Sequence, residues 1–520
     1  MPSKKQKMTL SMKQSQFKMK ILKTVTICLL STLCTFSVIA QDKGKNEKLD
    51  EMIMKGIQDW KIPGLAAIVV KDGKVVFQKT YGVKNLKTKE PVDGNTLFNM
   101  ASTTKAVIAI AMGMLVDEGK LKWDDRVIDH LPYFKLSDPY ITADARIKDL
   151  LTHNLGIGNA DALWSIDSTS TQQTIKKFEY AKKQYPLRGG FIYQNIMYAV
   201  AGEVIEAVSG QPWTAFVKNR ILDPLEMTRT QTKSRDIIQA GNYAIPYYDD
   251  MDDGVVRVDH TFSDQIGAAG MIWSTPNDIA HYLTFLVNGG IYKSDTLVRS
   301  ATFKKLFEPH SFQGGNGQYP TTALTKPNWN TYGLGWFQQD YRGHKLDFHT
   351  GSIAGLIAIV GIMHDEDLAV CVFANLDHAE LRHAILFKTI DLYAFDDNGR
   401  DWHGEVFNLY SGLKDSEKAF LEKQQKERIK ETVPSLPLED YVGTYSHKML
   451  GKVMVAVSGD VLQINFNDYK KYRATHWHYD TFKINKDPKW RSSFVVTFAL
   501  DSRGKSSELN VMGEIFRKIK

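Results

Sequence analysis

The chain has 520 residues, of which 43% are hydrophobic and 24% are charged, a composition typical of globular proteins and not of disordered or fibrous ones. It carries 66 Lys and Arg against 59 Asp and Glu, but seven of the lysines lie within residues 1–40, where there is no acidic residue. The rest of the chain carries 59 groups of each sign, which excludes binding to nucleic acid through net positive charge.

Residues 1–40 have the features of an export signal. The seven lysines precede an uncharged, largely apolar stretch over residues 24–40, and the polar residues Gln41 and Asp42 follow it. This arrangement predicts a cleaved signal peptide and therefore a periplasmic or secreted protein with no stable membrane span after cleavage. An uncleaved membrane anchor is the alternative, because the stretch is only slightly shorter than the roughly 20 residues that cross a bilayer.

The cysteines exclude a disulfide framework. Cys28 and Cys34 lie in the predicted leader, and only Cys371 remains, in an apolar run over residues 368–374 that reads as a buried strand. A single cysteine can form neither an intramolecular disulfide nor a Cys-rich metal site. We therefore expect the hydrophobic core alone to stabilise the exported protein.

Residues 41–400 are predicted to form an α+β domain. An Asp-Gly turn between two β-rich runs predicts an early hairpin, and strand character returns only after a long helical block. Strands at both ends of a domain predict one antiparallel sheet flanked by helices, with the intervening block as a helical subdomain. The expected elements are a helix over 46–60, strands over 65–70 and 74–82, helices and loops over 97–282, strands over 332–336, 345–350, 355–362 and 368–374, and a helix over 379–395.

The end of the chain is predicted to form a charged helical linker over residues 401–435 and a small all-β domain over residues 436–520. Short aromatic and β-branched runs alternate with turns in the latter, which favours a lipocalin-like barrel or a sandwich. His476 and His478 alternate along one expected strand. Two histidines without acidic or cysteine partners are more often structural, so no metal site is predicted.

Three short motifs carry the chemistry. In the first, Ser102-Thr103-Thr104-Lys105 runs into an apolar helical segment. Residues three apart share one helical face, so Lys105 can approach the Ser102 hydroxyl at the start of the helix, where that hydroxyl could also cap free amides. A serine becomes a nucleophile when a base accepts its proton, and burial lowers the pKa of a lysine toward that of a base.

The second motif is Tyr193-Gln194-Asn195. A tyrosine can relay a proton to a leaving group, and an amide can orient a substrate carbonyl. The third is His349-Thr350-Gly351-Ser352, on an expected late strand. Its glycine would let a substrate approach the strand backbone closely. Backbone amides of Ser102 and Ser352 could then form an oxyanion hole. Taken singly, each motif is better explained by capping, packing or a buried structural histidine.

Their order and spacing resemble the serine β-lactamase and penicillin-binding-protein superfamily, especially its class C-like branch, over residues 48–395. Leu150-Leu151-Thr152-His153, Gly267-Ala268-Ala269-Gly270 and Tyr332-Gly333-Leu334-Gly335 are also similar to that branch. The resemblance implies that Ser102 is the acyl-forming nucleophile, that Lys105 activates it and that Tyr193 transfers protons. It implies substrate contacts for Asn195, His349, Thr350 and Ser352, and no cofactor.

His349 stands where many members of the superfamily have a lysine. A neutral histidine attracts a substrate carboxylate less strongly, which weakens the interpretation as a β-lactamase. The sequence therefore predicts an exported serine hydrolase that acts on a small-molecule or peptide substrate, such as a cell-wall peptide, with peptidase or amidase activity. An esterase, a class C-like β-lactamase and a catalytically silent penicillin-binding-like protein are the alternatives.

Overall fold

The computed structural model describes residues 43–519, apart from residues 315–316, 485, 488, 490 and 492. The predicted signal peptide over residues 1–40 therefore lies outside the described residues. Across the described part of the chain, no helix combines the length and the apolar character needed to cross a membrane. Residues 43–59 are helical, close to the range that the sequence predicted.

One eight-stranded antiparallel sheet forms the framework of the first domain. Its order is β2-β1-β14-β13-β12-β11-β10-β9, so the early hairpin pairs with the late strand β14. Asp72 and Gly73 join the hairpin with positive φ angles, as the tight turn between such strands requires. The single sheet closed by distant pairings is confirmed. The strands are β1 Gly64–Lys71, β2 Lys74–Gly82, β9 Ser311–Phe312, β10 Asn330–Tyr332, β11 Phe337–Tyr341, β12 His344–Ile353, β13 Leu356–Met363 and β14 Leu368–Ala374.

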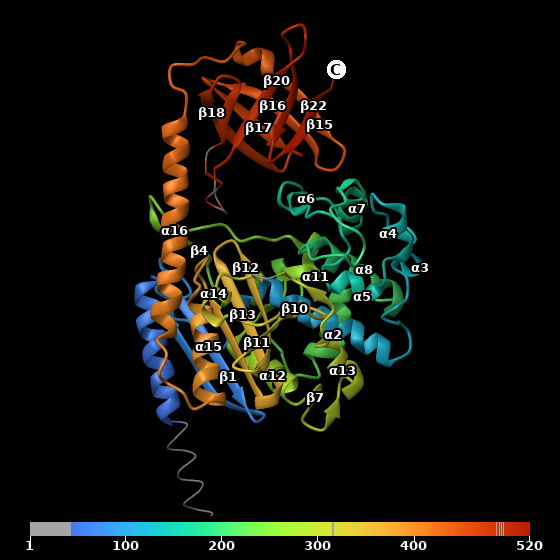
Figure 1. The fold of residues 1–520 in the computed structure, drawn as a ribbon, viewed down its shortest axis with the longest axis vertical. Helices are drawn as coiled ribbons and strands as arrows, with labels where there is room; N and C mark the ends of the chain where they lie inside the picture. The colour runs from blue at the N-terminus through green and yellow to red at the C-terminus, as the bar shows by residue number, and fades with distance from the viewer. Residues whose placement is uncertain are drawn as a thin grey trace, which may run out of the picture. The chain divides into compact units, whose positions relative to one another are not determined.

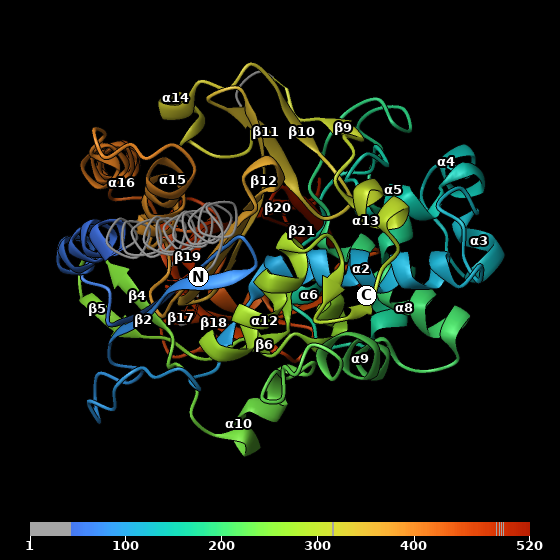
Figure 2. The ribbon, with the colours of Figure 1, turned by 90° about the horizontal axis from the view of Figure 1, so that it is seen from below.

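The centre of this sheet is buried on both faces. Every residue of β13 and β14 is buried, because helix α15 (Leu381–Ala394) packs on these strands and helix α12 (Pro276–Val287) packs on β14 and β1 (Figure 2). Cys371 lies in the middle of β14, opposite Ile68 of β1 and Val360 of β13, and is fully buried as a free thiol. Continuous apolar runs are typical of strands covered on both faces.

The strand predicted over residues 332–336 is wrong. Strand β10 ends at Tyr332, β11 begins at Phe337, and the residues between them form the turn that joins the two strands. Gly335 adopts a φ of 87°, and a side chain there would come within 3.0 Å of the Lys105 carbonyl oxygen. Residues 333–336 thus form a tight turn, which a glycine allows to lie against the helix that carries Lys105.

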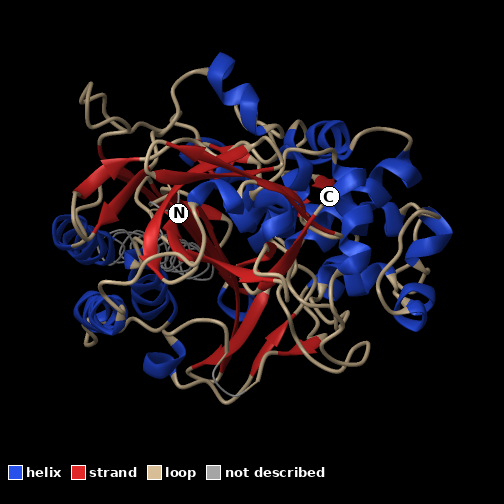
Figure 3. Ribbon diagram, turned by 90° about the horizontal axis from the view of Figure 1, so that it is seen from above, coloured by secondary structure: helices blue, strands red, loops and turns tan. Residues whose placement is uncertain are grey.

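Helices make up most of the regular structure between β2 and β9, together with three two-stranded sheets, β3-β6 (Phe98–Asn99 and Trp273–Ser274), β4-β5 (Tyr247–Asp250 and Gly254–Arg257) and β7-β8 (Ile291–Tyr292 and Asp295–Thr296). The central helix of this helical block, α2 (Thr104–Asp117), is buried on almost every side and packs against α8 (Asn195–Ser209) and α11 (Gly267–Gly270). Figure 3 shows a group of helices beside the strands. This block is the predicted helical subdomain, and it places the starts of α2 and α8, which carry two of the three motifs, next to each other.

The C-terminal part consists of helix α16 (Trp402–Glu427) and a closed eight-stranded antiparallel barrel (Figure 1). Buried and exposed residues alternate along its strands, with Val453 and Val455 of β16 inside. The small all-β domain is confirmed, in its barrel form. The strands are β15 Gly443–His447, β16 Gly451–Ser458, β17 Val461–Phe466, β18 Lys470–His478, β19 Thr481–Ile484, β20 Val495–Leu500, β21 Ser506–Val511 and β22 Glu514–Lys518.

Candidate active site

Ser102 lies in a short 3-10 turn, Ala101–Thr103, that leads directly into α2. Ala101 adopts a left-handed φ of 45°, an uncommon conformation for alanine, and its amide donates to Asn99 Oδ1 at 2.5 Å. The position of Ser102 in the sequence also suits a capping residue. Thr103 occupies the N-cap of α2 instead, and no side chain caps that end. The hydroxyl of the half-buried Ser102 therefore remains available for other contacts.

Lys105 is the second residue of α2 and is fully buried, with its ammonium beside Ser102. Nζ donates to Ser102 Oγ at 3.1 Å, to Asn195 Oδ1 at 2.8 Å and to the carbonyl oxygen of Ala269 at 2.7 Å. All three acceptors are neutral. Burial therefore lowers the pKa of Lys105 to about 7, with Asp161 opposing the fall. The geometry brings the predicted nucleophile and the predicted base within hydrogen-bond distance.

Tyr193 lies on the loop before α8 and contacts the same lysine, with Lys105 Nζ 4.9 Å from the centre of its ring. Burial raises the pKa of Tyr193 well above 10, and a side-chain hydrogen bond with Ser102 opposes the rise. The phenol thus keeps its proton at neutral pH. His153 packs on this ring at 4.3 Å, and its Nδ1 accepts from the Gln194 amide at 3.0 Å, which fixes the backbone beside Tyr193.

Asn195 is the first residue of α8, and its amide group bridges two charged residues. Its oxygen accepts from Lys105, while its Nδ2 donates to Asp161 Oδ2 at 3.0 Å. Asp161 Oδ1 accepts from Trp164 Nε1 at 2.9 Å, and Asn159 Nδ2 donates to Oδ2 at 3.1 Å. The amide is thus held in one orientation between the lysine and the carboxylate.

His349 is buried in β12 and is uncharged. Its Nε2 lies 2.9 Å from the Tyr332 hydroxyl and its Nδ1 lies 2.6 Å from the Thr350 carbonyl oxygen. A carbonyl oxygen only accepts, so Nδ1 carries the proton. Burial, and next the charge of Lys105, lower the pKa of His349 to about 3. Thr350, also buried, donates from Oγ1 to the Tyr319 hydroxyl at 2.6 Å. Both predicted residues therefore belong to a polar and aromatic wall around the site.

Gly351 brings β12 against the turn that carries Ser102. A Cβ at this position would lie 2.7 Å from the Ser102 backbone nitrogen and 2.6 Å from the Met100 carbonyl oxygen, so a larger residue would force the strand away. The next residue, Ser352, is exposed and lies with Ser102 on the wall of a narrow cavity of about 40 Å³. The rest of the wall consists of Ala101, Trp164, Asn195, Ile266, Ala269, Gly270, Met271 and Ile353.

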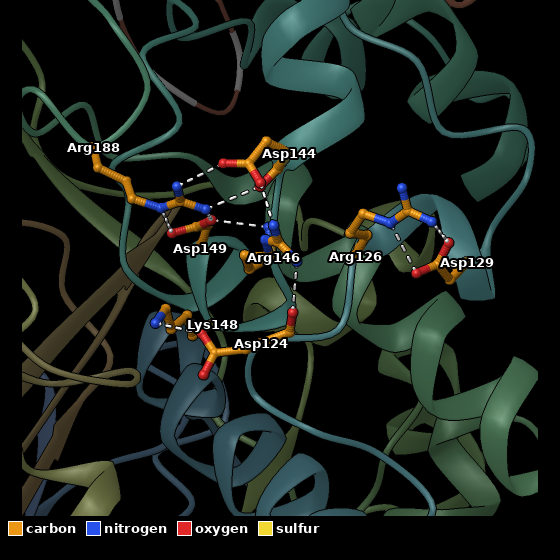
Figure 4. Close-up of polar contacts among 8 residues, drawn as sticks. All are labelled: Asp124, Arg126, Asp129, Asp144, Arg146, Lys148, Asp149 and Arg188. Carbon is orange, nitrogen blue, oxygen red and sulfur yellow. Dashed lines mark hydrogen bonds and ion pairs between the residues drawn. The ribbon is translucent and has the colours of Figure 1, made fainter.

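Arg188 fixes the start of the loop that carries Tyr193. Its guanidinium donates from Nε to Asp149 Oδ1 at 3.1 Å and from Nη2 to Oδ2 at 2.6 Å, and Nη1 donates to Asp144 Oδ2 at 2.9 Å (Figure 4). Asp149 is buried in α5 (Ile147–Leu151), and Arg146 also pairs with Asp144. A bidentate arginine–carboxylate contact gives geometric restraint as well as energy. The loop is therefore anchored to the helical block before it reaches the site.

The structure brings all seven predicted site residues to one region of the molecule, around the starts of α2 and α8 and the end of β12. Sequence reasoning missed Asp161, the carbonyl of Ala269, the packing of His153 and Tyr332, and the buried pair of Glu380 and Arg382. The segments holding His153, Ala269 and Tyr332 had been singled out by the resemblance alone. Within the described residues, no group of three or more His, Cys, Asp or Glu side chains is placed to hold a metal.

Comparisons with known proteins agree with this geometry. The sequence profile of the Beta-lactamase family matches residues 49–395, and that of a domain of unknown function, DUF3471, matches residues 427–517. Unguisins hydrolase ungD of Aspergillus violaceofuscus is 27% identical over 435 residues, which cover 77% of this chain and 74% of the fungal protein. Protein flp of Staphylococcus aureus is 28% identical over 337 residues, covering 64% of this chain and 63% of flp.

Solved structures share the fold. The octameric penicillin-binding protein homologue from Pyrococcus abyssi superposes with a TM-score of 0.58 at 21% identity, over 91% of this chain and 99% of its own. SurE superposes with a TM-score of 0.58 at 18% identity, over 92% of this chain and 99% of its own. At these identities the likeness describes the arrangement of helices and strands.

Proposed function

The chain belongs to the Beta-lactamase family, and from this premise we propose that it is an exported serine hydrolase. It cleaves an amide, peptide or ester bond through an acyl-enzyme on Ser102. We rank peptidase or amidase activity first, esterase activity second and β-lactamase activity third. One observation carries the proposal: the buried Lys105 ammonium lies 3.1 Å from the Ser102 hydroxyl, and the pKa of Lys105 falls to about 7.

The first step is attack by Ser102. Neutral Lys105 accepts the hydroxyl proton at Nζ while Oγ forms a bond to the substrate carbonyl carbon. The carbonyl oxygen takes up the negative charge between the backbone amides of Ser102 and Ser352. One such donor contributes a factor of about 10²–10³ in kcat. Asn195, held between Lys105 and Asp161, supports the proposal because its amide is fixed beside the reacting atoms.

The second step is departure of the leaving group. Tyr193 holds its proton at neutral pH and donates it to the leaving nitrogen or oxygen as the scissile bond breaks. The proton that Lys105 took from Ser102 then returns to the phenolic oxygen. The acyl group remains on Ser102 until a water molecule attacks it, which releases the acid and restores the serine.

The ranking of substrates rests on the charges around β12. His349 is neutral, so it offers no positive charge to a substrate carboxylate at the position where many β-lactamases have a lysine. This favours peptide, amide or ester substrates over β-lactams. Wall-derived peptides fit a protein exported by its N-terminal segment, and analysis of the N-terminus of the protein recovered outside the cytoplasm tests that export.

Covalent labelling tests the proposal directly. A fluorophosphonate and a fluorescent penicillin are each incubated with the purified protein, and the modified residue is identified by mass spectrometry. We expect the adduct on Ser102, none in Ser102→Ala, and unchanged labelling in Ser165→Ala, which removes a serine hydroxyl elsewhere in the helical block. Equal labelling of the Ser102→Ala variant would refute the assignment.

Turnover of three substrate classes tests the ranking. D-aminoacyl p-nitroanilides, p-nitrophenyl esters and nitrocefin are compared side by side, with kcat/KM expected to fall in that order. A catalytically silent protein, the alternative from another class, would form no adduct with either covalent probe. Retention of Ser102, Lys105 and Tyr193 in contact argues against it, because a binding role does not need a nucleophile beside its base.

A further inference from the structure

Arg382, near the start of α15, reaches the end of β12 beside the site. Its side chain is buried, and Nη1 donates to the carbonyl oxygen of Gly351 at 2.5 Å, to that of Ala358 at 3.3 Å and to Ser352 Oγ at 3.0 Å. The other edge of the guanidinium donates to both oxygens of Glu380, at 3.0 and 3.1 Å. The group is therefore restrained on both edges, by the sheet on one and by a carboxylate on the other.

These contacts fix the direction of one peptide unit. Gly351 and Ala358 are cross-strand partners, so the Gly351 carbonyl is held toward β13. A trans peptide points its C=O and the following N–H in opposite directions. The amide of Ser352 therefore points away from β13. In the described residues β11 pairs with β12 only as far as Phe348, so the strand has no pairing partner on that side at Ser352.

The turn that carries Ser102 lies against this stretch of β12. Gly351 packs against the Ser102 backbone nitrogen, and Ser102 and Ser352 share the wall of the same cavity. We propose that Arg382 is a positioning residue that sets the oxyanion hole, by fixing the peptide between Gly351 and Ser352 so that its N–H faces the reacting carbonyl. This inference rests on the proposed function, since the oxyanion arises only during acyl transfer.

The charge of Arg382 strengthens the same donor. A cation at the carbonyl oxygen polarises the peptide, so the N–H at the other end becomes a better hydrogen-bond donor. Glu380 neutralises the guanidinium, and Nη1 is already used by three acceptors on the protein. Arg382 therefore acts through the backbone of β12 and is not a ligand for a substrate carboxylate.

The test separates transition-state effects from binding effects. Arg382→Met and Arg382→Lys are assayed with a p-nitrophenyl ester, and the rate of fluorophosphonate labelling is measured alongside. We expect kcat of Arg382→Met to fall about 10- to 100-fold, less than the loss of an oxyanion donor outright, with KM changed less than threefold. Labelling should slow in parallel. Arg382→Lys should recover part of kcat, because its ammonium can still donate to the Gly351 carbonyl.

Arg342→Gln is the matched control. It removes an arginine that pairs with Asp391 on the same helix α15, at 3.2 Å, without touching Gly351. We expect a lower melting temperature and an unchanged kcat. If Arg382→Met fails to fold, Arg382→Lys carries the test, with kcat expected below that of the wild type.

Two results would overturn the inference: a folded Arg382 variant with wild-type kcat, or a raised KM with kcat intact, as expected of a residue that binds substrate. Wild-type protein that is not labelled on Ser102 would instead refute the proposed function.

Discussion

Two buried cations serve the region around Ser102 and Gly351, and they meet opposite electrostatic conditions. Lys105 donates its hydrogen bonds to three neutral oxygens, from Ser102, Asn195 and Ala269, and its pKa falls to about 7. Arg382 contacts the carboxylate of Glu380, and its pKa is raised, although burial opposes the rise. Both charges are removed from water, so the opposite directions of the two pKa shifts come from the carboxylate that contacts Arg382.

This difference suits the two cations to different roles, one in proton transfer and one in positioning other groups. A buried lysine with no carboxylate in direct contact can lose its proton near neutral pH and act as a base. A buried cation with a bidentate carboxylate keeps its charge and holds other groups in place. The fold places one cation of each kind near the end of β12: Lys105 contacts Ser102, and Arg382 contacts the backbone of Gly351.

The largest effect is expected from removing the base. Lys105→Met and Lys105→Arg should each lower kcat/KM by about 10³-fold or more, because a guanidinium stays protonated and cannot accept the Ser102 proton. Ester turnover measures the loss, and circular dichroism checks the fold. If Lys105→Arg keeps activity within tenfold of the wild type, positive charge and not basicity is what the site requires.

Removing the counter-charge of Arg382 should mainly affect stability. Glu380→Gln leaves a buried guanidinium uncompensated, which costs about 3–5 kcal/mol of the free energy of unfolding. Urea denaturation measures the loss. Combining Glu380→Gln with Arg382→Met should restore a large part of that stability, because both charges are then absent. Equal stability of the wild type and the Glu380→Gln variant would show that the pair is not coupled.

The pH dependence of acylation should report Lys105. Below pH 7 the ammonium is protonated, so the rate should rise about tenfold per pH unit and level off above about 7, where the neutral base predominates. The rate of fluorophosphonate labelling between pH 5 and 9 measures this rising acid limb of the pH–rate profile. His349→Gln should leave its midpoint in place, since the pKa of His349 is about 3. A limb that vanishes in His349→Gln would assign it to the histidine.

The smallest effect is a displacement of that limb. Asp161 raises the pKa of Lys105 against the effect of burial. Asp161→Asn removes the negative charge and can preserve hydrogen bonds, so the acid limb should move to lower pH while the plateau rate changes little. Asp59→Asn, which alters a carboxylate paired with His403, provides a control in which the limb should stay. A shift to higher pH in Asp161→Asn would contradict the electrostatic account.

The sequence predicted the parts of the site that are local. Ser102 and Lys105 lie on one helical turn, and Tyr193 and Asn195 flank the start of a helix, so spacing alone suggested which side chains could act together. The centre of the sheet was likewise predictable, because β1, β13 and β14 are apolar runs bounded by turn residues. The strands β9, β10 and β11, which are short or polar, were not predicted with their bounds. The turn at residues 333–336 was mistaken for a strand because aromatic residues flank it.

The missed residues act across long separations in the chain. Arg382 contacts Gly351 and Asp161 contacts Asn195 only after the fold is complete, and neither belongs to a motif of regular spacing. A signal for the first was present: Glu380 and Arg382 are charged residues at the start of a largely apolar helical stretch, where burial requires that charges be paired. Periodicity predicted the helix and did not indicate what its charges contact.

Cys371, buried in β14 between β1 and β13, can report the unfolding of the protein. From residue 41 onward it is the single cysteine, and burial raises its pKa well above the usual thiol value. A thiol reagent should therefore leave Cys371 unmodified in the folded chain and react with it when the centre of the sheet separates. The rate of that reaction would follow the opening of the core in every variant described above, without an added probe.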